Sequence, residues 1–186
     1  MNDVASGILR ITFVAPPVGM SGGIRVMAIY AKMLAEFGHR VVVVSPPAAP
    51  ISFKQKLKYW LRNQEWPVLN PPRSHLDGQG LDHRVLSAHR PVTDKDVPDA
   101  DVVIATWWET AEWVNTLSAR KGVKIYFIQH HEVFDFVPED RCIATYRLPL
   151  HKIVIAQWLA RLMRDEYGDA NVDLVSNSVD HRQFFA

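Results

Sequence analysis

Residues 8–45 read ILRITFVAPPVGMSGGIRVMAIYAKMLAEFGHRVVVVS, and this stretch decides the fold. An apolar run is followed by a glycine-rich turn, an amphipathic helical pattern that begins at Ile24, and a valine-rich run that ends at Ser45. The pattern predicts a βαβ unit, in which a right-handed crossover of about 25 residues joins two parallel strands. Gly38 is expected to end the helix, because glycine is the usual residue just past a helix C-terminus.

The turn Ser21-Gly22-Gly23 is the first candidate site, since ligands of parallel sheets bind where strand ends meet helix starts. Gly22 and Gly23 allow positive φ angles, and the N–H groups that open the helix favour an anion such as a diphosphate. A tight turn without a ligand is the alternative. The spacing does not match G-x-G-x-x-G, no acid ends the second strand, and no P-loop lysine follows. A dehydrogenase and a P-loop nucleotidase are therefore disfavoured.

Composition indicates one globular domain. The chain has 186 residues, of which 48% are hydrophobic and 22% charged, and its net charge of +1 argues against a nucleic-acid partner. Cys142 is the single cysteine, so an internal disulfide is excluded and a reducing compartment is favoured. No apolar run is long enough to span a membrane, and the N-terminus lacks a signal-peptide pattern. We expect a cytoplasmic protein.

Strand and helix patterns alternate beyond the first unit. Further strands are predicted at 82–87, 100–106, 123–129, 152–156 and 172–175, and helices at 107–121, 138–148 and 157–167. This order predicts the fold class: α/β, with a Rossmann-like open parallel sheet and helices on both faces.

His130-His131-Glu132 follows one of these strands, at the same edge of the sheet as the glycines. A histidine that hydrogen-bonds a hydroxyl or phosphate beside an acid is one interpretation, and histidines that cap a loop without function are the other. Zinc is disfavoured because no second cluster of ligands is spaced to complete a site, so no metal is predicted. Trp107 and Trp108 follow the preceding strand, where indole rings stack on sugars or only pack in the core. Thr110 offers a hydroxyl to a ligand or caps its helix.

The segment 51–66 is predicted to be a basic amphipathic helix. It carries Lys54, Lys56, Lys58, Trp60 and Arg62 beside an apolar stripe. This composition favours a peripheral membrane contact or a wall that faces an anionic substrate, and a surface helix with solvated lysines is the alternative.

Three segments resemble the GT-B glycosyltransferases of the large retaining family four. The first comprises Gly22-Gly23-Ile24-Arg25, the helix with Leu34-Ala35, and Gly38-His39-Arg40-Val41. The second comprises 105–111 together with 126–132, where Tyr-Phe-Ile-Gln-His-His-Glu is similar to Tyr-Phe-Val-Gln-Asp-Tyr-Glu of rhamnosyltransferase-like members. The third, 175–184, is similar to the family's Asn-Gly-Val-Asp-x-x-x-Phe, with Ser178 in place of glycine.

The resemblance implies that residues 1–186 form the N-terminal, acceptor-side half of a GT-B fold, and that the donor-binding domain is absent from this chain. It implies retaining, metal-independent transfer of a sugar from a nucleotide-diphosphate sugar to a glycan or lipid-linked acceptor, in cell-surface polysaccharide synthesis and without a cofactor. Such an enzyme would work in the cytoplasm or at the inner membrane face, and the isolated half is expected to be inactive. The alternatives are a binding or regulatory subunit that needs a partner, and a GT-B-fold sugar-nucleotide epimerase.

The resemblance also implies roles for single residues. His130 or His131 would contact the transferred sugar, and the sequence leaves open which of the two does so. The residues implied for the donor phosphates are Gly22, Gly23 and Arg25. The residues implied for the acceptor are Trp107, Trp108, Thr110 and Glu132.

Overall fold

The computed structural model describes residues 7–50, 61 and 73–177. Its elements in chain order are β1 (Arg10–Val14), α1 (Gly22–Glu36), β2 (Arg40–Ser45), β3 (Asp82–Val85), β4 (Val102–Ala105), α3 (Trp108–Thr116), a 3-10 turn (Ala119–Lys121), β5 (Val123–Ile128), α4 (Glu139–Thr145), β6 (His151–Val154), α5 (Gln157–Asp165) and β7 (Val172–Leu174). The seven strands form one sheet in the order β3-β2-β1-β4-β5-β6-β7, and every adjacent pair is parallel. The predicted Rossmann-like α/β class is confirmed.

The order of the strands creates a switch point beside β1. Ile11 of β1 lies opposite Val41 of β2 on one side and Val102 of β4 on the other. The chain builds β2 and β3 outward in one direction, then returns to add β4 to β7 in the other direction. In open parallel sheets, a ligand usually binds in the crevice at the carboxyl ends of the two strands where the order reverses, which here are β1 and β4.

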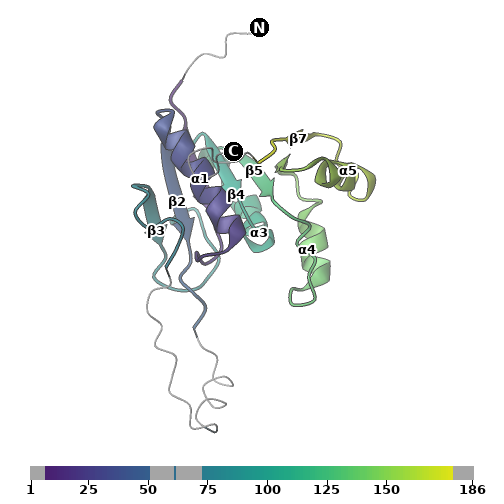
Figure 1. Cartoon of the computed structure of the whole chain (residues 1–186), viewed down its shortest axis with the longest axis horizontal. Coiled ribbons are helices and arrows are strands. Elements are labelled where there is room, and N and C mark those ends of the chain that lie inside the picture. Colours follow the sequence, from purple (N-terminus) through teal and green to yellow (C-terminus); the bar gives the residue numbers. More distant parts are fainter. Residues whose placement is uncertain (1–6, 51–60, 62–72, 178–186) are drawn as a thin grey trace, which may run out of the picture.

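Two hydrophobic cores cover the two faces of the sheet, because successive side chains of a strand point to opposite sides. Helix α1 packs with one core, which includes Ile11, Phe13, Val43, Ile104, Phe127, Met27 and Ala31. Helices α3 and α5 pack with the other, which includes Val14, Val44, Val103, Tyr126, Ile128, Val114, Leu159 and Met163. Helices α4 and α5 lie toward the β7 end of the sheet, away from β3 (Figure 1). The prediction of helices on both faces is confirmed.

Local signals explain both ends of α1. The Ser21 hydroxyl caps the first turn by accepting a hydrogen bond from the Ile24 N–H at 3.4 Å. At the other end, Gly38 has a φ of 94°, and its N–H donates to the Ala35 carbonyl while the His39 N–H donates to the Leu34 carbonyl. This pair of hydrogen bonds is a Schellman motif, which confirms that Gly38 ends the helix.

The glycine turn leads directly into α1. Gly22 and Gly23 are the first two residues of α1, and neither has a positive φ. The conformational freedom that glycine allows is therefore not used at either position, and the turn from β1 into α1 ends at the cap residue Ser21. The predicted helix at 51–66 lies outside the described residues, apart from Leu61.

Candidate functional site

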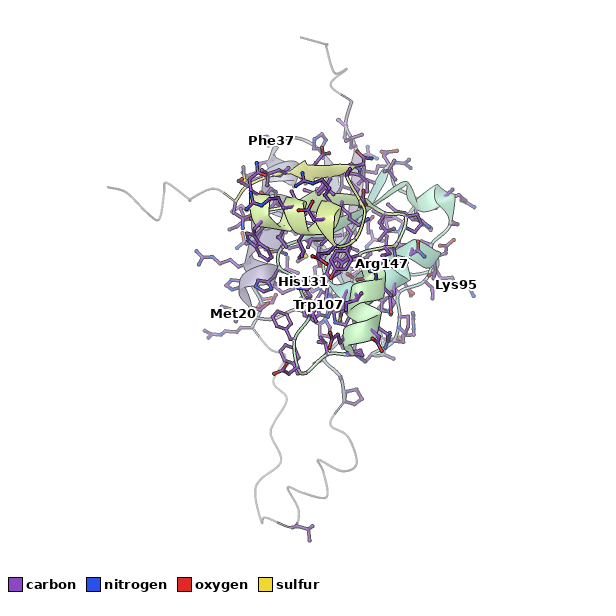
Figure 2. All side chains as sticks on the ribbon, turned by 90° about the vertical axis from the view of Figure 1, so that its right-hand side faces the viewer. Met20, Phe37, Lys95, Trp107, His131 and Arg147 are labelled. Carbon is purple, nitrogen blue, oxygen red and sulfur yellow. The ribbon has the colours of Figure 1, made fainter. Side chains whose placement is uncertain are left out.

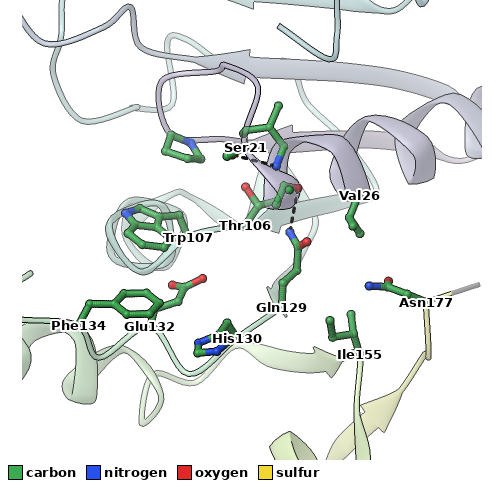
Figure 3. A pocket seen from close by; sticks show the side chains of 14 residues that line it. Ser21, Val26, Thr106, Trp107, Gln129, His130, Glu132, Phe134, Ile155 and Asn177 are labelled. Atoms are coloured by element: carbon green, nitrogen blue, oxygen red, sulfur yellow. Dashed lines mark hydrogen bonds between the residues drawn. The ribbon is translucent and has the colours of Figure 1, made fainter.

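A cavity of about 420 Å³ opens at the carboxyl edge of the sheet, over the switch point between β1 and β4. Its walls come from the β1–α1 turn, the first turns of α1, and the segments that follow β4, β5, β6 and β7 (Figure 3). The lining residues are Pro16, Ser21, Gly22, Gly23, Ile24, Val26, Thr106, Trp107, Gln129, His130, Glu132, Phe134, Ile155 and Asn177. Its volume falls within the range of about 300 to 1,000 Å³ that is usual for small-molecule sites.

The start of α1 forms one wall. Gln129 donates a hydrogen bond from Nε2 to the Gly23 carbonyl at 3.2 Å, which joins the end of β5 to the first turn of the helix (Figure 3). A methyl group added at Gly23 would lie 3.7 Å from Gln129 Nε2, whereas one added at Gly22 would meet nothing within 4 Å. Within the described part of the chain, the N–H groups of both glycines have no hydrogen-bond acceptor. Arg25 is exposed and does not line the cavity.

Thr110 caps its helix and does not reach the cavity. Its hydroxyl accepts hydrogen bonds from the N–H groups of Thr106 and Trp107, at 3.0 and 2.9 Å, and donates to the Trp107 carbonyl at 2.8 Å. The side chain is fully buried. The prediction that Thr110 contacts an acceptor is not compatible with this burial, because the helix start consumes the hydroxyl.

The two tryptophans diverge, although they are adjacent in sequence. Trp107 precedes α3 and lines the cavity, whereas Trp108 is the first residue of α3 and is only 4% exposed. The Arg141 guanidinium lies over the Trp108 ring at 4.8 Å from its centroid. Trp108 contributes to the site through its backbone, since its N–H donates to the Glu132 carboxylate. Its indole packs against Arg141 of α4 and does not line the cavity, so the structure does not bring this ring to the site.

Glu132 is a buried acid in the floor of the cavity. It is 3% exposed, and its Oε2 accepts hydrogen bonds from the Trp108 N–H at 2.8 Å and the Tyr126 hydroxyl at 2.9 Å. The Tyr146 hydroxyl is 2.7 Å from the Glu132 backbone nitrogen and accepts its hydrogen bond. Burial raises the pKa of Glu132 to about 8, although the two hydrogen bonds to the carboxylate act in the opposite direction. This acid therefore holds a proton at neutral pH.

The two histidines also diverge, which answers the question that the sequence left open. His130 is exposed, lines the cavity, and places Nδ1 2.8 Å from the His131 carbonyl oxygen. His131 places Nε2 2.6 Å from the Tyr167 hydroxyl and stacks on Tyr146, with 5.4 Å between ring centroids. It lies between α4 and α5 in Figure 2, and burial lowers its pKa. The His131 ring packs in this cluster and does not line the cavity, so the structure favours His130 as the residue that faces a ligand.

A row of aromatic rings borders the cavity. The Phe134 ring stacks with both Trp107 and His130, with centroid distances of 6.5 and 5.4 Å and interplanar angles of 13° and 19°. Trp158 of α5 meets His130 edge-on at 5.7 Å, and Phe136 stacks on Phe134 at 5.2 Å. We refer to Trp107, Phe134 and His130 as the aromatic row. Its rings stand almost parallel beside the Glu132 carboxyl group (Figure 3).

The sequence analysis missed Gln129 and Phe134 as members of the site. Gln129 ends the predicted strand, and strand-end position was the available signal for it. Phe134 had a weaker signal, namely a pair of aromatic residues with Phe136 just after Glu132.

Two other predictions concern metals and membranes. Among the described residues, no group of three or more His, Cys, Asp or Glu side chains is placed to hold a metal ion. In the same part of the chain, no helix has the length and apolar character needed to cross a bilayer. The predicted membrane-facing residues Lys54, Lys56, Lys58, Trp60 and Arg62 all lie outside the described residues.

Comparison with known proteins gives little further information. No family model and no curated protein matches the sequence. Among solved structures, a glycosyltransferase from Rickettsia africae ESF-5 superposes on 93% of this chain with a TM-score of 0.46 and 13% sequence identity. The chain spans 44% of the length of that protein. Similarity at this level does not establish a shared function.

Proposed function

We propose that this chain forms the acceptor-side half of a retaining glycosyltransferase. In this proposal, a sugar passes from a nucleotide-diphosphate sugar to a glycan or lipid-linked acceptor, without a metal and in cell-surface polysaccharide synthesis. The observation that carries the proposal is the cavity at the switch point, where the aromatic row stands beside the buried acid Glu132. The resemblance of three sequence segments to family-four GT-B enzymes also supports it.

The chemistry of the cavity suits a sugar ring. A pyranose has apolar faces of C–H groups and a polar rim of hydroxyls, so it needs flat apolar surfaces and hydrogen-bonding groups within one site. Trp107 and Phe134 supply flat surfaces, while Gln129, His130 and Glu132 supply polar atoms. The open N-terminus of α1 lies on the opposite wall, where its N–H groups favour a phosphate of the donor.

His130 is the residue that we assign to the transferred sugar. A carbonyl oxygen can only accept a hydrogen bond, so the contact with the His131 carbonyl places the proton of a neutral imidazole on Nδ1. Nε2 is then an acceptor for a sugar hydroxyl. Most of the contacts to the nucleotide are assigned to a second domain that is not among these 186 residues, so the chain alone is expected to bind sugars without transferring them.

The first test measures binding by saturation-transfer NMR. The probes are methyl glycosides of glucose, mannose and rhamnose, together with UDP-glucose and GDP-mannose. Trp107→Ala should weaken glycoside binding about threefold to tenfold, which is the usual contribution of an aromatic contact. Phe37→Ala is the matched control, because Phe37 is an aromatic residue 71% exposed at the opposite end of α1. Absence of binding by all probes, or equal losses in both variants, would contradict the proposal.

A second test addresses the reaction. The polypeptide that the source organism produces should transfer label from a sugar nucleotide to a glycan or lipid extract in the presence of EDTA. The product should keep the anomeric configuration of the donor. Conversion of one sugar nucleotide into another would instead indicate an epimerase.

Membrane association is a separate part of the proposal. It rests on the basic composition of the segment with Lys54, Lys56, Lys58, Trp60 and Arg62. Each basic residue near an anionic surface contributes about 1 kcal/mol, so replacing the four with glutamine should weaken binding to phosphatidylserine liposomes at least about a hundredfold at low salt. Equal binding by the variant would remove the membrane contact from the proposal.

A further inference from the structure

One oxygen of Glu132 is left unused by the protein. Oε2 receives both the Trp108 N–H and the Tyr126 hydroxyl, so the two partners from α3 and β5 converge on a single atom. Within the described residues, Oε1 has no hydrogen-bond partner, although the side chain is 3% exposed and lines the cavity. Among the described residues, the fully buried side-chain atoms without a partner are Thr12 Oγ1 and Trp108 Nε1, so Oε1 is not sealed inside the protein. It is open to the cavity, where it can form a hydrogen bond with a ligand.

The surroundings of Glu132 favour its neutral form. Among the described residues, no lysine, arginine or histidine forms an ion pair with it, and Arg141, the nearest cation on α4, is bound to Glu112. The titratable groups that face it are Tyr126 from β5, and Tyr146 and Cys142 from the α4 segment. All three are uncharged at neutral pH, since burial raises the pKa of each. His130 lines the same cavity and forms no ion pair with Glu132 among the described residues.

The hydrogen bonds also place the proton. An oxygen that accepts two hydrogen bonds is a poor site for a third hydrogen, so a proton on this carboxyl group is expected at Oε1. The group that Glu132 presents to the cavity is then an O–H donor and not a carboxylate.

We propose that Glu132 recognises an uncharged ligand oxygen that carries no hydrogen, such as a ring or ether oxygen, by donating a hydrogen bond from Oε1. This inference rests on the proposed function in that it takes the ligand to be a hydroxyl-bearing ring stacked on the aromatic row. It names Glu132 as the residue that presents a hydrogen-bond donor, and no negative charge, to that oxygen. Loss of the proton replaces the donor with a negative charge that repels the lone pairs of the same oxygen.

The experiment is a pH titration of ligand affinity. Binding of methyl glycosides, tetrahydropyran and anisole is measured by NMR between pH 6.5 and 9.5, and folding is checked by circular dichroism. Tetrahydropyran and anisole each carry one ether oxygen, which accepts a hydrogen bond and cannot donate one. The dissociation constant should stay constant up to about pH 8 and then rise about tenfold per pH unit. Burial lowers the pKa of His83 and His131 and raises the pKa of Cys142 to about 11, so none of these three groups accounts for such a slope.

Two variants test the role of the proton. Glu132→Gln presents a permanent N–H donor in the same place, so it should lose the pH dependence and bind about tenfold more tightly than wild type at pH 9. Glu139→Gln removes an exposed carboxyl group at the start of α4 and should keep the wild-type slope. Loss of binding in folded Glu132→Gln would overturn the inference, because it would show that the carboxylate is the required form.

A second measurement remains decisive if Glu132→Gln does not fold. The side-chain carboxyl ¹³C resonance of Glu132 is titrated in the wild-type protein with and without a bound probe. By linkage, a ligand that prefers the protonated acid moves the midpoint to higher pH. An unchanged midpoint means that the acid has only a structural role, and it overturns the inference.

The outcomes separate this inference from the proposed function. Glycosides that bind without any pH dependence would overturn the role of Glu132 and support the glycosyltransferase proposal. Tetrahydropyran or anisole that binds with the predicted slope, when no glycoside binds, would support the role of Glu132 and contradict the glycosyltransferase proposal. Binding by none of these probes would overturn both.

Discussion

The buried acid predicts an unusual dependence of stability on pH. The pKa of Glu132 is about 8 in the folded protein, compared with an ordinary value of 4.5. Between these two pH values the folded protein keeps a proton that the unfolded chain has lost. The folded state is therefore favoured fully below about pH 4.5, and this contribution is lost as the pH rises toward 8.

The size of the effect follows from the same interval. Each pH unit between 4.5 and about 8 removes about 1.4 kcal/mol, so the contribution of Glu132 to the free energy of unfolding should fall by about 5 kcal/mol in total. A domain of this size is stable by about 5 to 15 kcal/mol, which makes the loss easy to measure. His131 and His83 act in the opposite direction, because burial lowers the pKa of each and makes it a base that prefers to be neutral in the folded state.

The measurement is urea unfolding at pH 5, 6, 7 and 8, followed by tryptophan fluorescence. The histidines are shared by wild type and Glu132→Gln, so the difference between the two isolates the acid. The free energy of unfolding of Glu132→Gln should rise relative to that of wild type by about 1.4 kcal/mol for each pH unit. The plot of unfolding free energy against pH for Glu139→Gln should remain parallel to that of wild type. Parallel curves for Glu132→Gln and wild type would refute the reasoning, since they would mean that Glu132 ionises normally in the folded protein.

Three further predictions concern the scaffold, and urea unfolding tests each. Gly122→Ala should lower the free energy of unfolding by about 3 kcal/mol or more, because φ is 91° and the new methyl group would lie 2.3 Å from the Asp101 backbone. Gly38 is the matched control, since its φ is 94° but the space around it is open. Gly38→Ala should lower the free energy of unfolding by only about 1 kcal/mol. Lys152→Met should cost about 2 to 3 kcal/mol, because Lys152 is 2% exposed and its ammonium group bonds two carbonyls and a carboxylate that would lose their partner; a cost below 0.5 kcal/mol would refute the argument. Ser21→Ala should cost about 0.5 to 1 kcal/mol through loss of the helix cap, and no change would mean that the 3.4 Å hydrogen bond contributes nothing.

The sheet was predictable because its strands are short apolar runs between strong turn signals. Most valines of β2 and apolar residues of β4 and β5 are buried or half-buried, as expected for a parallel sheet covered by helices, and Val123 at the start of β5 is the exposed exception. The carboxyl edge followed from this topology without further information, since parallel strands bring their ends together. Gly22, Gly23, Trp107, His130 and Glu132 were therefore placed at one cavity by sequence alone.

Side-chain directions beyond the strand ends were not predictable. Alternation places Tyr126 and Ile128 in one core and Phe127 in the other. The strand ends at Ile128, so the alternation of side chains along a strand does not predict the direction of His131. In the structure, the His131 ring packs against Tyr146 and Tyr167. Those tyrosines come from segments distant in sequence, and no local pattern shows that they meet there.

The segment that follows β5 organises the site, because its side chains form hydrogen bonds with the first turns of two helices. Gln129 bonds the first turn of α1 through the Gly23 carbonyl, and Glu132 bonds the first turn of α3 through the Trp108 N–H. Between them, His130 lines the cavity and uses one ring nitrogen on the backbone of the same segment. A ligand that bonds Oε1 of Glu132 thus meets a carboxyl group already oriented by two hydrogen bonds. Because the Glu132 side chain is already held in place, it loses little conformational entropy when a ligand binds. A single neutral hydrogen bond from it can therefore discriminate between ligands.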